Sequence, residues 1–332
     1  MSINIDSAGK KNIILTNYDK IIFLLIIILA ILAPFYLSAF MLTVAIRILY
    51  MTVLVYSLSF LARGGMISLG QTIFFGLSGY TLARLLIIHN YSHASALALG
   101  ILLALLGAVL LGLIVIRTKG VYFIMITLAL GQMGWGIALQ WSSLTRGDDG
   151  IIGVRPPAIL GIDFRNRLYF YYLMLLLFII IYLLLRRINS SRFGLALKAI
   201  NDNPEKLKSL GYNVEFIRYI AFVISGFLAG IAGIIFVYYN GIINPATINI
   251  NRAVWMLVAA ILGGINSLVG PLIGVASVLL MEVQIRRFTD RYMIIIGTVF
   301  VLVILFMPEG IWGFLESKIN KLKKSLGLTR TH

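Results

Sequence analysis

LYFYYLMLLLFIIIYLLL, from Leu168 to Leu185, contains no charged residue. A helix crosses the ~30 Å hydrocarbon core of a bilayer with about 20 apolar residues, so this run is nearly long enough to span it. Comparable runs follow one another from Ile21 to Met307, and 60% of the 332 residues are hydrophobic while 12% are charged. A soluble protein could neither bury nor expose so much apolar surface. The sequence therefore predicts an all-α, polytopic membrane protein, because backbone groups in lipid must be paired within helices.

The apolar runs divide one membrane domain, residues 21–316, into a series of spans. The hydropathy pattern predicts about 8–10 transmembrane helices, some of them broken or re-entrant at glycines. A cytoplasmic tail, residues 1–20, is expected before this domain, and a basic cytoplasmic tail, residues 317–332, after it. The expected spans are Ile21–Phe40, Met41–Leu61, Ile67–Ile88, His93–Ile116, Val121–Trp141, Leu168–Leu185, Phe216–Asn240, Ala253–Met281 and Met293–Met307. Between them we expect an external loop, residues 142–167, and a cytoplasmic segment, residues 186–215.

Lysine and arginine predict the orientation of these spans. Lys10, Lys11 and Lys20 place the N-terminus in the cytoplasm by the positive-inside rule. The lysines of the C-terminal tail indicate that this end is cytoplasmic too. The same rule accounts for the net charge of +16, because lysine and arginine gather beside the lipid bilayer. We therefore expect the lipid bilayer, and no nucleic acid, as a partner of this basic chain.

The longest run, Ala253–Met281, is expected to break in its middle. A single crossing there would put the C-terminal lysines outside, against the positive-inside rule. Two half-length helices that enter and return to the same side avoid this conflict, and one long tilted helix with tolerated glycines is the alternative. The candidate break residues in this run are Gly263, Gly264, Ser267, Gly270 and Pro271.

A similar set of small residues occurs early in the chain. GGMISLG, residues 64–70, shares Gly-Gly, Ser-Leu and a following glycine with GGINSLVG, residues 263–270. Paired glycine-broken segments in the two halves of a transporter often mark its pathway, and chance recurrence is the alternative. The early candidates for the pathway or a helix break are Gly65, Ser68, Gly70 and Gln71.

The cytoplasmic segment has the pattern of a docking element. Residues 192–200 can form a short amphipathic helix, and Asn203-Pro204 indicates an N-cap followed by proline at the first helical position. Gly211 supplies a left-handed stop, which predicts a compact helix over about 204–210 that exposes Leu207 and Leu210. Such a helix suits a groove on a cytoplasmic partner, and an interfacial helix lying on lipid is the alternative. The candidate coupling residues are Arg192, Phe193, Gly194, Ala199, Asn203, Glu205, Leu207, Leu210 and Gly211.

The sequence offers little for catalysis. It contains no cysteine and three histidines, and it has neither a phosphate-binding loop nor a metalloprotease motif. We therefore expect no catalytic residue, metal or cofactor on this chain. Glu282 is the one plausible acid inside a span, which disfavours a stand-alone carrier or channel as well as an intramembrane enzyme. Arg47 and Arg84 lie near expected outer ends of spans, where they can snorkel to water.

Several segments, taken in order, resemble the M-type permease subunit of the bacterial high-affinity branched-chain amino acid ABC importer. The matching pieces are ISLGQTIFFG (67–76), YFIMITLA (122–129), SRFG (191–194), AFVISG (221–226), LGG (262–264), Ser267-Leu268 and Gly270-Pro271. Asp148, Asp149 and Gly150 resemble part of the family's external loop. Their order and spacing over most of the chain make the combination specific. Arg146 departs from the pattern, because the family often has glycine there.

The resemblance implies a heteromeric importer of which this chain is one permease subunit. Its implied partners are a second, H-type permease, two cytoplasmic ABC ATPases that dock on residues 192–211, and an external substrate-binding protein. The implied location is the bacterial plasma (inner) membrane. The implied cargo is branched-chain amino acids, with urea, short amides or other amino acids as the alternative. Selectivity can reside in the binding protein, so we expect the pathway to lack a tight substrate site.

Overall fold

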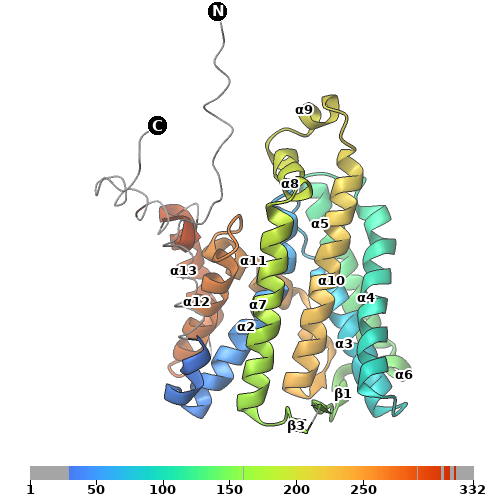
Figure 1. Cartoon of the computed structure of the whole chain (residues 1–332), viewed down its shortest axis with the longest axis vertical. Helices are drawn as coiled ribbons and strands as arrows, with labels where there is room; N and C mark the ends of the chain where they lie inside the picture. Colours follow the sequence, from blue (N-terminus) through green and yellow to red (C-terminus); the bar gives the residue numbers. More distant parts are fainter. Residues whose placement is uncertain (1–29, 160, 290, 308–309, 315–317, 319–332) are drawn as a thin grey trace, which may run out of the picture.

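The structure, a computed structural model, describes residues 30–159, 161–289, 291–307, 310–314 and 318. Within these ranges the chain is a bundle of helices with a few two-residue strands (Figure 1). The first expected span, Ile21–Phe40, lies outside the described residues up to residue 29, and residues 30–36 are helical. The N-terminal tail, and the C-terminal tail apart from Lys318, also lie outside.

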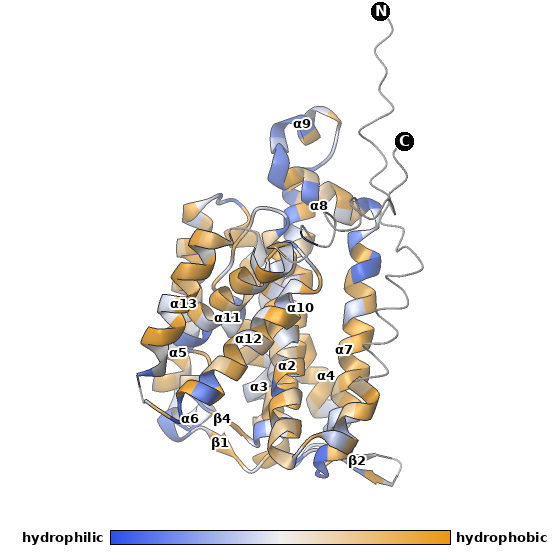
Figure 2. Cartoon of the chain, turned by 90° about the vertical axis from the view of Figure 1, so that its left-hand side faces the viewer, coloured by the Kyte–Doolittle hydropathy of each residue, from blue (hydrophilic) through white to orange (hydrophobic). Residues whose placement is uncertain are grey.

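The long helices follow the apolar runs closely. They are α2 (Ala39–Ala62), α3 (Gln71–Ile87), α4 (His93–Val115), α5 (Val121–Gln140), α7 (Arg167–Asn189), α10 (Val214–Asn240), α11 (Ile250–Gly263), α12 (Gly270–Ile285) and α13 (Tyr292–Phe306). In the described part of the chain, six helical segments are long and apolar enough to cross a membrane, and shorter apolar helices accompany them. Apolar residues dominate the bundle, as Figure 2 shows. The expected all-α membrane architecture is confirmed.

Helix α10 forms the centre of the bundle and packs against α2, α3 and α4. Small residues make this close packing possible. A Cβ atom on Gly226 or Gly230 would meet the Cβ atoms of Ala108 and Ala104 on α4, and one on Gly233 would meet the Phe75 carbonyl of α3. Close backbone approach between membrane helices depends on such residues.

The long run Ala253–Met281 is divided, as expected, into α11 and α12. The two helices pack against each other, and α12 runs antiparallel to α2. Tyr56, near the end of α2, donates a hydrogen bond to the Leu268 carbonyl at 2.8 Å, whereas Arg47, near its start, pairs with Glu282 at 3.5 Å. This hairpin of half-length helices replaces the alternative of one long tilted helix.

The two ends of the bundle carry different small elements (Figure 1). One end holds α8 (Arg192–Asp202) and α9 (Pro204–Ser209). The opposite end holds α6 (Ser142–Thr145), the 3-10 turns η1 (Gly147–Asp149) and η2 (Pro245–Thr247), and the strands β1 (Ile151–Ile152), β2 (Ala158–Ile159), β3 (Ile162–Asp163) and β4 (Ile242–Ile243). Strand β1 pairs with β4, and β2 with β3, both antiparallel. The expected docking segment and external loop therefore lie at opposite ends.

Candidate functional site: two helix breaks and the elements beside them

Helix α8 follows α7 after a corner at Ser190 and Ser191, and Gly194 lies in its first turn. Ser191 caps α8 by accepting a hydrogen bond from the Gly194 amide at 3.3 Å. A Cβ atom on Gly194 would collide with the Ile188 carbonyl and the backbone of Asn189, so this corner requires glycine. Arg192 is exposed beside the corner, and Phe193 and Ala199 are half-buried.

Helix α9 has the local structure that its sequence predicts. The Asn203 side chain accepts a hydrogen bond from the Lys206 amide at 3.0 Å, and Pro204 occupies the first turn. Gly211 takes the left-handed conformation, with φ +84°, just past the helix end. Glu205 pairs with Lys208 at 3.9 Å, but both side chains are exposed and the pair contributes little stability.

The expectation that α9 exposes both of its leucines was wrong for Leu207. Leu207 is 7% exposed and belongs to the core, whereas Leu210 is 68% exposed. The reason is tertiary: α9 packs against α8 and the start of α10, so its inner face is covered. Leu210 lies beyond the last helical residue, Ser209, and remains outside. Exposed apolar side chains at this end include Leu195, Leu210 and Tyr212, which are here called the inner patch.

Helix α8 sits directly on the break between α2 and α3. A Cβ atom on Gly64 would lie 2.5 Å from Cδ1 of Leu197, a side chain that is 1% exposed. A Cβ atom on Gly65 would lie 2.8 Å from Oδ1 of Asn201. Gly65 also has φ +73°, a conformation that favours glycine. This contact joins the expected docking element to the expected pathway.

The first break, residues 64–70, is held by hydroxyl groups. Ser68 accepts a hydrogen bond from the Gly70 amide at 3.3 Å, and Thr127 of α5 accepts one from the Leu69 amide at 3.2 Å. Gly70 itself packs against the Thr127 carbonyl. Gln71 follows at the start of α3 and is fully buried, and its amide atoms have no hydrogen-bond partner among the described residues.

The second break, residues 263–270, repeats this local structure. Gly264 has φ +106°, and Ser267 accepts a hydrogen bond from the Gly270 amide at 2.6 Å. Pro271 then lies in the first turn of α12. Gly263 packs against the backbone of Gly270 and Gly274, and Gly310 packs against Gly264. Both sequence echoes thus pair a glycine of positive φ with a serine that accepts a hydrogen bond from the amide of the later glycine.

The external-loop candidates lie at the opposite end of the bundle. Asp148 and Asp149 are exposed in η1, and Gly150 has φ +68° where a Cβ atom would collide with the Ile243 carbonyl. Arg146 also has a left-handed backbone, with φ +65°. Arg84, near the end of its span, donates from Nη1 to the exposed Ser143 and Leu144 carbonyls at 2.8 and 2.7 Å.

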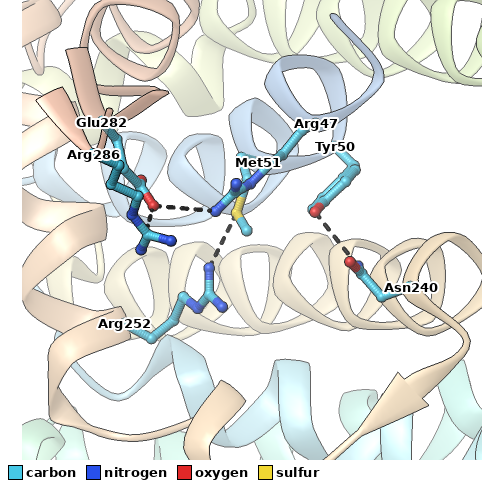
Figure 3. Close-up of polar contacts among 7 residues, drawn as sticks. All are labelled: Arg47, Tyr50, Met51, Asn240, Arg252, Glu282 and Arg286. Carbon is cyan, nitrogen blue, oxygen red and sulfur yellow. Dashed lines mark hydrogen bonds and ion pairs between the residues drawn. The ribbon is translucent and has the colours of Figure 1, made fainter. Parts of the chain in front are cut away.

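Arg47 belongs to a charged cluster between α2 and α12 (Figure 3). Glu282, with a side chain 5% exposed, pairs with Arg47 at 3.5 Å and with Arg286 at 2.8 Å. These three residues and Arg252 of α11 line a cavity of about 430 Å³. Sequence reasoning missed Arg252, although an arginine in the first turn of an apolar helix was a signal for it.

The comparison with protein families decides the assignment. The family described as branched-chain amino acid transport system / permease component matches residues 40–304. This chain belongs to that family. It is therefore the permease component of a transport system and a multi-pass membrane protein.

Individual relatives agree with the family. The high-affinity branched-chain amino acid transport system permease protein LivM of Escherichia coli (strain K12) is 24% identical over 322 residues, covering 89% of this chain and 75% of LivM. The corresponding protein LivH of the same strain is 31% identical over 128 residues, covering 38% of this chain and 41% of LivH. The probable permease LivH of Methanocaldococcus jannaschii is 30% identical over 141 residues, covering 40% and 44%. No solved structure matches the chain.

Proposed function

We propose that this chain imports branched-chain amino acids as one permease subunit of an ABC importer in the bacterial plasma (inner) membrane, with both termini cytoplasmic. Two cytoplasmic ATPases dock on α8 and α9, an H-type permease completes the pathway, and a binding protein delivers cargo at the end that carries Asp148 and Asp149. The names of the LivM and LivH relatives support the cargo and the second permease.

The contact between α8 and the first break is the observation that carries this proposal. Leu197 and Asn201 of α8 touch Gly64 and Gly65, which connect α2 to α3. A partner that moves α8 therefore displaces the start of α3 without crossing any flexible linker. Because packed interfaces switch between discrete arrangements, a small displacement there is enough to change which side of the pathway is open.

The inner patch supplies the docking surface. Leu195, Leu210 and Tyr212 are 59%, 68% and 47% exposed, beside a helix that is rich in charge. An apolar patch with a charged rim is typical of protein interfaces. Gly194 stands directly before Leu195, and Gly211 lies between Leu210 and Tyr212 with a left-handed backbone.

Cross-linking tests the docking directly, since the chain contains no cysteine of its own. A Leu210→Cys variant in the assembled importer is expected to cross-link to an ATPase subunit. Leu110 on α4 is 62% exposed, and Leu110→Cys is the matched control. This variant is expected not to cross-link to an ATPase subunit. Cross-linking from neither position, or equally from both, would remove the docking claim.

Uptake into proteoliposomes tests the cargo and the energy source. Leucine uptake is expected with all subunits, binding protein and ATP present, and to vanish when the ATPases are omitted. Urea and a short amide serve as competing cargos in the same assay. Uptake of leucine by the purified chain alone would instead establish a stand-alone carrier or channel.

A further inference from the structure

The charged cavity described above lies on the half of the bundle remote from α8. Glu282 and Arg286 lie near the end of α12, and Arg47 near the start of α2, while α8 touches the far end of α2. Charged side chains from α2, α11 and α12 converge on this space in Figure 3, where Arg252 reaches toward Met51 and the Glu282 cluster. Residues of α13 complete the lining with Ile296 and Gly297.

Positive charge exceeds negative charge around this cavity. Its described lining contains Arg47, Arg252 and Arg286 but a single carboxylate, Glu282. Glu282 is already shared between Arg47 and Arg286. Charged groups inside a membrane protein are costly unless they are paired or mark a pathway for ions or substrates.

Arg252 is the arginine of this lining for which the described residues form no direct ion pair. Its Nε donates to the Thr247 carbonyl at 3.3 Å, and its Nη1 lies 3.7 Å from Sδ of Met51. The guanidinium carbon also lies 5.7 Å from the centre of the Phe236 ring. These neutral contacts orient the guanidinium group toward the cavity and leave its positive charge available to an anion.

The rest of the lining is suited to an aliphatic group. Val254, Trp255, Val258 and Ile296 provide apolar walls beside the arginines. A cavity of about 430 Å³ lies within the size range of small-molecule sites, roughly 300–1,000 Å³. An apolar wall next to a cationic group complements a small molecule that has an aliphatic body and a carboxylate at one end.

We propose that this cavity is a binding station for cargo, in which Arg252 receives the carboxylate and the Trp255 wall receives the aliphatic side chain. This deepens the proposed function and rests on it for the identity of the cargo. Such a station is compatible with the expectation that the pathway lacks a tight substrate site, because a cavity that holds cargo weakly leaves selectivity to the binding protein.

Binding is measured on the full chain in phosphatidylcholine vesicles, without any other subunit. Trp255 lies in the cavity wall, so leucine is expected to change tryptophan fluorescence saturably, and a Trp255→Phe variant should lose that change. Leucinamide, which lacks the carboxylate, is expected to bind at least about tenfold more weakly, since a hydrogen-bonded charge pair contributes ~1.5–3 kcal/mol. Equal binding of leucine and leucinamide would overturn the proposal.

Variants locate the anion site. Arg252→Gln is expected to weaken leucine binding at least about tenfold, whereas Arg252→Lys retains part of it because the charge remains. Arg187→Gln, which removes an exposed arginine of α7, is the matched control and should bind like the original chain. Unchanged binding in Arg252→Gln would also overturn the proposal.

The source of the anion is tested by adding phosphatidylglycerol to the vesicles. If anionic lipid abolishes the effect of leucine at all concentrations, the cavity holds a lipid headgroup and the cargo assignment falls. Failure of this inference is distinguishable from failure of the proposed function. An importer that takes up leucine while the chain shows no fluorescence response refutes the station alone, and absence of both uptake and response refutes the function.

Discussion

The two Gly-Gly…Ser-Leu breaks have nearly the same local structure and different surroundings. The first, at Gly64–Gly70, packs against α8, a short helix at the end of the bundle that carries Leu195 of the inner patch. The second, at Gly263–Gly270, packs against its own hairpin and against Gly310. Tyr56 of α2 also ties the second break to the centre of the bundle through the Leu268 carbonyl.

This difference indicates that the two breaks have separate roles. A break whose neighbour is an exposed element at the end of the bundle can receive motion, whereas a break that packs on itself resists it. We therefore regard the first break as the moving joint and the second as the fixed support of the hairpin. The following substitutions test that division, beginning with the largest expected effect.

Gly263→Val should damage the second break most severely. Its side chain would collide with the backbone of Gly270 and Gly274, which cannot move aside as a flexible side chain can. We expect a loss of more than about 3 kcal/mol in the free energy of unfolding and little folded protein after purification. Gly136→Val is the control, because nothing lies within 4 Å of a Cβ atom there. Size-exclusion chromatography after heating compares the two, and equal survival would contradict the tight packing.

Gly65→Ala should have a smaller effect at the first break. The left-handed conformation costs about 1 kcal/mol for alanine, and the contact with Asn201 Oδ1 adds to that cost, so we expect a loss of about 1–2 kcal/mol. The double variant Gly65→Ala/Asn201→Ala should remove the stability loss caused by the contact with Asn201. It should keep the loss caused by the left-handed backbone conformation. Thermal unfolding curves of the single and double variants give both values. A double variant no more stable than Gly65→Ala would show that α8 does not press on the break.

Tyr56→Phe tests the tie between α2 and the second break. Loss of the hydrogen bond to the Leu268 carbonyl should lower the free energy of unfolding by about 1 kcal/mol, because the carbonyl loses its donor. Tyr122→Phe, with the tyrosine 74% exposed, should be neutral within about 0.5 kcal/mol. Equal thermal unfolding midpoints for Tyr56→Phe and Tyr122→Phe would show that the Tyr56 hydrogen bond does not stabilise the fold.

The two serines give the smallest contrast. Ser267 accepts from the Gly270 amide at 2.6 Å, whereas Ser68 accepts from the Gly70 amide at 3.3 Å. Ser267→Ala should therefore cost about 1 kcal/mol, and Ser68→Ala roughly half of that. Hydrogen exchange of the Gly70 and Gly270 amides reports each of these two hydrogen bonds separately. A larger loss of protection at Gly70 than at Gly270 would reverse the proposed order of rigidity.

Local chemistry explains what the sequence could predict. Features that depend on residues close together in the chain could be predicted from the sequence. These are the spans, the break before Gly270, the Asn203 cap and the left-handed Gly211. Contacts between distant residues were not readable. The burial of Leu207, the contact between Leu197 and Gly64, and the approach of Arg252 to Met51 each depend on how the helices pack. The roles of the break, coupling and external-loop residues remain predictions.

The contact between α8 and the first break is tested most directly by the amount of leucine taken up per ATP hydrolysed. This ratio is measured in Gly64→Ala and in Gly64→Ala/Leu197→Val. Alanine at residue 64 would push against Cδ1 of Leu197, and valine at 197 removes that atom. Overpacking that costs ~1–3 kcal/mol should lower the leucine taken up per ATP about tenfold in the single variant. The double variant should regain most of this uptake per ATP. A folded Gly64→Ala importer with the original ratio would contradict the account.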